Sequence, residues 1–294
     1  MHFRSANREA RTTVLIPLYG ADPFIDQITD NLRKIPQSAL VIISDQCQLD
    51  GALETLKAIH QNDRRIVFRS VDGPAGWRSH INSMIKNIQT EFFSILAQDD
   101  EIDPGYYEAL EKALDANPKV GVAFGKVDVI GVYGDPERRR MASPGIPLGV
   151  RAPWREALDL DKYWNLGIPY RGLIRAKLLS LVPVTPGDMY ADEIWIFSLA
   201  LISHLIEVPQ AIYVKRLHSR NTSTQWRPLT GAERKVALMR EVQLRLGNNH
   251  PALRELSLPR WHPRVWHQYV CKKSLKKYLR KVIPNFLKPI LKRI

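Results

Sequence analysis

The sequence predicts an α/β protein with a mostly parallel sheet covered by helices on both faces, followed by a C-terminal helical extension. Two observations predict this class. In the first 130 residues, short apolar runs alternate four times with longer segments of helical spacing, and such repeats give parallel strands. The apolar runs are rich in β-branched and aromatic residues, which is typical of strands buried on both faces.

In chain order, each expected strand is followed by an expected helix. We expect strands at 13–17, 40–44, 66–70, 92–97 and 120–124, and helices at 24–34, 52–60, 78–88 and 106–116. Pro23 and Pro104 lie near the starts of two of these helices. Proline is favoured there because the first helical N–H groups have no partner within the helix.

The second half of the chain is less regular. A stretch rich in Pro, Gly and Arg follows residue 130 for about 25 residues, a length that favours a functional lid or a mobile connection. Order returns with an apolar segment at 170–181, a helix from about residue 191 that begins with acids, and a strand-like run in 208–223. Residues 231–256 have the pattern of one or two helices.

Composition excludes several classes of protein. The 294 residues are 45% hydrophobic and 25% charged, and they include only two cysteines, Cys47 and Cys271. A disulfide scaffold, a collagen-like chain and a disordered chain are therefore excluded. No apolar run approaches the roughly 18 residues of a membrane span, and the first residues contain no apolar signal-peptide core. We expect a cytoplasmic protein.

The positive charge is concentrated at the end of the chain. The net charge is +13, and residues 270–294 hold nine Lys and Arg residues without one acid. Apolar residues recur there at helical spacing, interrupted by Pro284 and Pro289. The pattern predicts short amphipathic helices on an anionic membrane surface, at the inner face of the cell membrane. One alternative is a helix packed on the domain. Another is nucleic-acid binding, but the lack of interleaved aromatic and basic residues disfavours it.

Polar residues collect where the expected parallel strands end. The four connecting loops are 17–22, 44–51, 71–77 and 97–103, and we call them the loop edge. Ligands of parallel sheets bind at the carboxyl ends of the strands. The loop edge is therefore the predicted binding site, although each Asp in it could instead form a turn or a helix cap.

The motifs at the loop edge resemble those of a known family. They are VLIPLYG, Asp45 after the second strand, GPAGWRSHIN, ILAQDDEIDPGYYEAL, GLIRAKLL, Asp192 before an apolar helix and RLHSRNTS. In this order and spacing they resemble the family 2 glycosyltransferases of the GT-A fold, over roughly residues 12–225. The resemblance implies a catalytic domain at 1–230 that binds a nucleotide-sugar donor, and a helical extension at 231–294.

By resemblance, a divalent cation, Mn²⁺ or Mg²⁺, binds at Asp99 and His218 and neutralises the leaving diphosphate. Asp100 orients the donor sugar or supports the ligands. Ala97 occupies the place of the family's first acid, which leaves the coordination number open. Alternatively, the two acids cap the helix that follows Pro104.

The resemblance also assigns the nucleotide and the acceptor sites. Pro17, Leu18 and Tyr19 would line the nucleoside pocket, and Asp45 would bind the base or ribose. The resemblance adds Gly76 and Asn82 to the donor site. Arg78, Arg216 and Arg220 could pair with diphosphate oxygens, because guanidinium groups match that geometry, although each alone is more often a solvated surface charge. Aromatic residues that could stack on the acceptor are Trp154, Trp164, Tyr170 and Trp195, although such residues are more often part of a core.

Inverting sugar transfer needs a base that deprotonates the acceptor hydroxyl. The resemblance implies Asp192 for this role, with Glu193 as the fallback, whereas a purely structural reading makes them a helix cap and a first-turn acid. The expected acceptor is a glycan or a lipid-linked glycan of cell-surface polysaccharide assembly. A degenerate relative that binds nucleotide without turnover, and a nucleic-acid-binding protein, remain the alternatives.

Overall fold

The computed structural model describes residues 10–46, 50–71, 76–86, 88–131, 136–141, 148–163, 167–183, 191–219 and 231–257. The predicted residues Trp164 and Arg220 and the basic segment 270–294 lie outside these ranges. Among the residues that are described, no helix is both long and apolar enough to cross a membrane.

The strands form one mixed sheet in the order β3-β2-β1-β4-β8-β6-β9-β5, with β7 paired to β6. Their bounds are β1 Thr12–Leu18, β2 Leu40–Gln46, β3 Ile66–Val71, β4 Phe92–Ile95, β5 Glu101–Ile102, β6 Val120–Ile130, β7 Arg139–Arg140, β8 Leu173–Arg175 and β9 His204–Arg216. The first four strands are parallel, as predicted. β8 is antiparallel to both β4 and β6, so the second half of the sheet is mixed.

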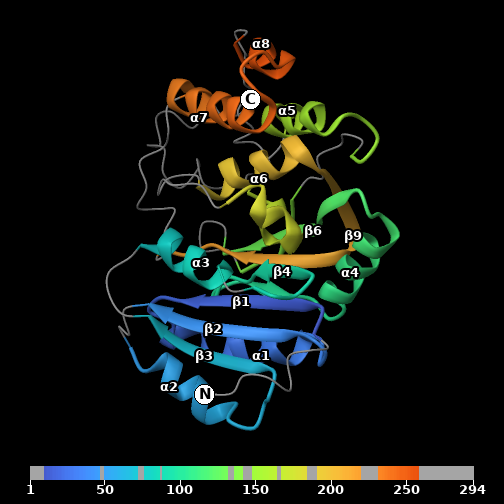
Figure 1. The fold of residues 1–294 in the computed structure, drawn as a ribbon. Helices are drawn as coiled ribbons and strands as arrows, with labels where there is room; N and C mark the ends of the chain where they lie inside the picture. The colour runs from blue at the N-terminus through green and yellow to red at the C-terminus, as the bar shows by residue number, and fades with distance from the viewer. Residues whose placement is uncertain are drawn as a thin grey trace, which may run out of the picture.

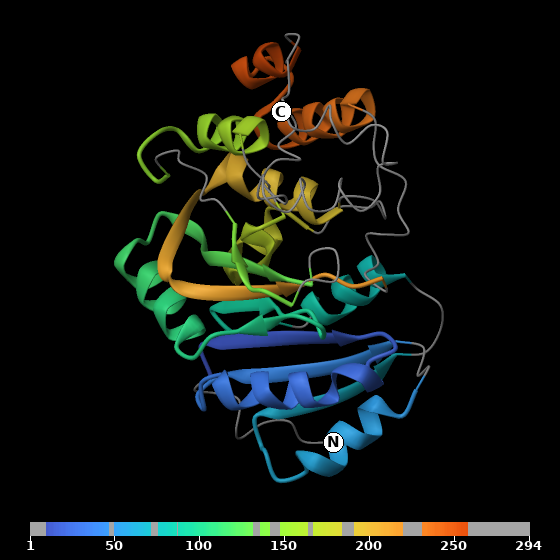
Figure 2. The same ribbon diagram turned by 180° about the vertical axis from the view of Figure 1, so that it is seen from behind.

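The predicted helices match the observed ones within a few residues, whereas α5 was not predicted. Their bounds are α1 Ile25–Lys34, α2 Ala52–Ile59, α3 Trp77–Ile85, α4 Tyr106–Ala116, α5 Pro153–Tyr163, α6 Ala191–Ile202, α7 Gly231–Leu246 and α8 Pro251–Ser257, with 3₁₀ turns η1 Asp22–Phe24, η2 Pro169–Arg171 and η3 Ala176–Ser180. In Figure 1, α1 lies behind β1–β3, and in Figure 2 it lies in front of them. α5, α7 and α8 lie at the opposite end of the molecule from β3 (Figure 1), and α7 packs against α6.

The core is continuous from the sheet into the helices. Val14, Leu15 and Ile16 of β1 are almost fully buried, because both faces of a parallel strand are covered. Large aromatic side chains fill the second half of the core: Trp195, Tyr106, Tyr107, Tyr213, Phe92, Phe93 and Phe124. Trp195 is therefore a core residue, and the acceptor-stacking role suggested for it is wrong.

One glycine is required by the packing of β6 on β9. A Cβ at Gly125 would lie 2.3 Å from the carbonyl oxygen of Ala211 and 2.8 Å from the Tyr106 ring. The β6–β9 register shifts between Gly125 and Lys126. Glycine thus permits the close backbone approach at this irregularity.

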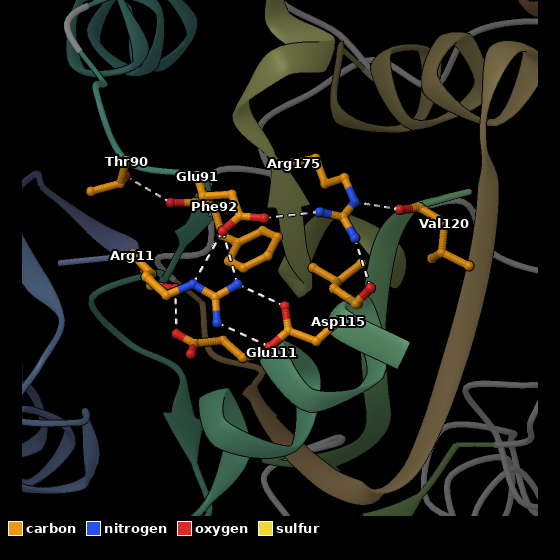
Figure 3. Close-up of polar contacts among 10 residues, drawn as sticks. Arg11, Thr90, Glu91, Phe92, Glu111, Asp115, Val120 and Arg175 are labelled. Atoms are coloured by element: carbon orange, nitrogen blue, oxygen red, sulfur yellow. Dashed lines mark hydrogen bonds and ion pairs between the residues drawn. The ribbon is translucent and has the colours of Figure 1, made fainter. Parts of the chain in front are cut away.

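The edge of the sheet opposite the loop edge is closed by an ionic cluster (Figure 3). Arg11 pairs with Glu91 at 2.8 Å and with Asp115 at 2.6 Å. Arg175 donates to the carbonyl oxygens of Val120 and Leu114 and pairs with Glu91, and both guanidinium groups lie 5.2 Å from the Phe92 ring centre. This cluster joins β1, β4, α4 and β8, whose sequences are far apart.

Candidate active site

Two parts of the loop edge are held together by Gln98. Its side chain accepts a hydrogen bond from the Tyr19 N–H at 2.7 Å and donates to the Tyr19 carbonyl at 2.8 Å. The backbone after β1 is thereby fixed to the turn after β4. The Tyr19 side chain remains 64% exposed, so its ring is available to a planar ligand, whereas Leu18 is buried beneath it in the sheet and Pro17 is partly buried.

The loops after β1 and β2 are joined by Asp50. One carboxylate oxygen accepts from the Asp22 N–H at 3.0 Å, and the other accepts from the Ala52 N–H at 3.1 Å. Asp45, predicted to follow β2, lies within this strand, opposite Leu18, and is buried. Strand β2 extends two residues further than the sequence pattern predicts.

Asp99 and His218 form the centre of the site. The Asp99 Oδ2 and His218 Nε2 atoms are 2.8 Å apart, although the two residues are 119 positions apart in the sequence. The Phe24 ring, in the loop after β1, lies 5.3 Å from the imidazole centre. Both polar side chains are partly exposed, at 17% and 23%, so a ligand can reach the pair.

Asp100, unlike Asp99, is buried and bonds to groups inside the protein. Its carboxylate accepts from the Tyr213 hydroxyl at 2.8 Å and from the Arg216 N–H at 2.8 Å, and it lies 3.6 Å from Arg171. Burial and the nearby Asp99 charge raise the pKa of Asp100. The carboxylate therefore fixes the end of β9, which carries His218.

The Asp99 oxygen and the His218 nitrogen suit a divalent cation that also binds water or phosphate oxygens. Two neighbouring ligands of one Mg²⁺ or Mn²⁺ ion lie about 3 Å apart, and such ions retain waters and phosphate oxygens beside one or two protein groups. The Asp99–His218 separation fits this geometry. Within the described ranges, no group of three or more His, Cys, Asp or Glu residues could hold a metal.

The two acids at the start of α6 have different surroundings. Glu193 lies 3.2 Å from Arg234 of α7, which also pairs with Asp161 of α5. Burial raises the pKa of Glu193, and the Arg234 charge opposes this effect. Asp192 forms no hydrogen bond or ion pair with another described residue, and its charge acts on Tyr170 and Lys215. Glu193 thus connects three helices, whereas the Asp192 charge acts on Lys215 of β9.

The other predicted donor-binding residues are distributed around the loop edge. Gly76 precedes α3, and Arg78 and Asn82 lie on this helix, partly buried. The Arg216 guanidinium is held by Glu101 and by Gln27, the latter at 3.3 Å. Of the remaining aromatic candidates, Tyr170 is partly buried and packs its ring on Trp195, and Trp154 packs on His250 at the far end of the molecule.

The structure adds residues that the motifs do not identify. Gln98, Arg171, Tyr213 and Lys215 lie around Asp99 and Asp100. Lys215 had a sequence signal, because a lysine directly before the RLHSRNTS motif interrupts a run of buried strand residues. Arg171 had none, since only the packing of η2 brings it to Asp100.

Comparisons with known proteins bear on the family and the fold of this chain. The family described as Glycosyl transferase family 2 matches residues 13–176, more than half of the chain. By sequence, no curated protein matches. Among solved structures, S. aureus TarS 1–349 in complex with UDP-GlcNAc is similar with a TM-score of 0.65 and 13% identity, over 95% of this chain and 78% of that one. The mannosyltransferase PcManGT from Pyrobaculum calidifontis, in complex with GDP-Man and Mn²⁺, is similar with a TM-score of 0.57 and 16% identity, over 98% of this chain and 80% of that one.

Proposed function

The chain belongs to glycosyl transferase family 2, and on that premise we propose that it transfers a sugar from a nucleotide-sugar donor to a glycan or lipid-linked acceptor with inversion at the anomeric carbon. The Asp99–His218 pair at the loop edge carries this proposal. The similar structures contain UDP-GlcNAc and GDP-Man, which supports a nucleoside diphosphate as leaving group.

The donor would lie along the loop edge. The exposed Tyr19 ring would stack on the base; hydrogen bonds from Gln98 to the N–H and carbonyl of Tyr19 support this proposal, because they hold its backbone in place. Asp99 and His218 would hold a divalent cation, which when bound stabilises charge on the diphosphate. Asp100 would act indirectly, because its contacts hold Arg216 and the end of β9 in place.

In the transfer step, the acceptor hydroxyl oxygen forms a bond to the anomeric carbon while the bond from that carbon to the diphosphate oxygen breaks. The bonding electrons leave with the nucleoside diphosphate. Asp192 accepts the hydroxyl proton, because it is the acid of α6 that forms no ion pair with a described residue. Glu193 is less suited to this role, since Arg234 holds it at 3.2 Å.

We also propose that the basic segment 270–294 brings the site to a membrane. Its nine cations and its apolar stripe suit an anionic leaflet, where each basic residue near the surface contributes about 1 kcal/mol. A lipid-linked acceptor of surface-polysaccharide assembly would then lie within reach of the loop edge.

Nucleotide titration tests the donor site. Calorimetry with UDP, GDP, dTDP and CMP, with Mn²⁺ or with chelator, should show cation-dependent binding of a nucleoside diphosphate by the wild-type protein. Asp99→Asn should weaken this binding at least tenfold, whereas Glu108→Gln, an equal charge change at an exposed position of α4, should not. Equal affinity with chelator and in Asp99→Asn would refute the metal role, and no binding of any nucleotide would refute the donor site.

A further inference from the structure

Lys215 of β9 faces the candidate active site. In the β6–β9 ladder, Tyr213 is paired with Val127 and Lys215 with Val129. Because side chains alternate along a strand, Lys215 is on the same face as Tyr213, whose hydroxyl bonds Asp100 at 2.8 Å. Arg216, one residue on, points to the other face and pairs with Glu101.

Four charged groups act on the Lys215 ammonium group. They are Arg171 from η2, Asp99 and Asp100 from the turn after β4, and Asp192 from the start of α6. Burial and the Arg171 charge lower the pKa of Lys215 to about 8, and the three acids only partly offset this. Lys215 is therefore near enough to Asp99, Asp100 and Asp192 for their charges to act on it.

None of these acids hydrogen-bonds the ammonium group. Asp100 bonds Tyr213 and Arg216, Asp99 bonds His218, and within the described ranges Lys215 makes no side-chain hydrogen bond or ion pair. A partly buried ammonium group in this state is costly, because its desolvation is not compensated. Its three donors can instead bind an anion that enters the site.

We propose that Lys215 binds the diphosphate of the donor and stabilises the negative charge that develops on it as it leaves. The inference rests on the proposed function, which supplies that leaving group. By resemblance, the family has an acid where this chain has Ala97, so the proposed cation site has few protein ligands. The Lys215 ammonium group would add positive charge where the leaving oxygen becomes anionic, and such stabilisation is greatest in the transition state.

Binding of three probes to matched variants tests this role. The nucleoside, the nucleoside monophosphate and the nucleoside diphosphate of the preferred base are titrated at constant Mn²⁺ into wild type, Lys215→Met and Lys126→Met. Lys126 is a partly buried lysine in the same ladder, paired with Ile212 and thus on the opposite face. It controls for the loss of one strand lysine.

Lys215→Met should weaken diphosphate binding by roughly 10- to 100-fold, the range for losing a hydrogen bond to a charged group. It should leave nucleoside affinity unchanged, and Lys215→Arg should recover part of the loss. Unchanged diphosphate affinity, or an equal loss for all three probes, would overturn the assignment of Lys215. Absence of diphosphate binding to wild type would instead show that the proposed function itself is wrong.

Discussion

His80 gives the folded protein a defined sensitivity to acid. Its Nε2 atom lies 2.8 Å from the hydroxyl of Ser44, one residue before Asp45, and both side chains are buried. Burial disfavours the charged imidazolium and lowers the pKa of His80 to about 4. In the unfolded chain the pKa returns to about 6.5.

The sign of the effect follows from proton binding. Between pH 6.5 and pH 4 the unfolded chain binds a proton at His80 that the folded chain does not, so stability falls as pH falls through this window. The complete loss is about 3.4 kcal/mol, at 1.36 kcal/mol for each tenfold difference in proton affinity. Between pH 7.5 and pH 5 the expected loss is about 2 kcal/mol.

Urea unfolding of the wild-type protein and His80→Gln measures this loss. Glutamine can keep a hydrogen bond to Ser44 but does not titrate. Asp100 and Glu193, whose pKa values burial raises, contribute to the pH dependence in the opposite direction. The difference between the two proteins cancels these contributions. From pH 7.5 to pH 5 the free energy of unfolding of the wild-type protein should fall by about 2 kcal/mol relative to that of His80→Gln. Parallel pH dependences of the two proteins would refute the reasoning.

Three further predictions concern other parts of the chain. Asp192→Asn should keep donor affinity but lower turnover by roughly 10²-fold, the usual effect of losing a general base; near-normal turnover together with an inactive Glu193→Gln would move the base to Glu193. Arg175→Met should lower the free energy of unfolding by about 2–4 kcal/mol, because the buried Arg175 guanidinium donates to two carbonyl oxygens (Figure 3). Arg11→Met, which changes a 46% exposed side chain, should lower it by less than about 1 kcal/mol. Equal losses for the two variants in thermal unfolding would contradict this prediction. A truncation after Gln268 should sediment less than the full chain with anionic vesicles at low salt; equal sedimentation would exclude the tail as anchor, and tight duplex binding would favour a nucleic-acid partner.

The predicted elements were largely confirmed because their signals are local. A buried parallel strand needs only a short β-branched run, and a helix needs apolar residues three or four positions apart. The runs that became β1, β2, β3 and β6 are therefore visible in the sequence. The antiparallel insertion of β8 between β4 and β6 was not predicted, since a three-residue strand carries no information about its neighbours.

The site residues separate in the same way. That acids cluster after β4 and at the start of α6 is visible from the sequence alone, because it depends only on neighbouring residues. The packing of the chain brings Asp99 to His218 and Asp100 to Tyr213, and it pairs Glu193 with Arg234 while the Asp192 charge acts on Lys215. Adjacent residues point in different directions, and the partner of each is set by the packing of segments far apart in the sequence, which no local pattern encodes.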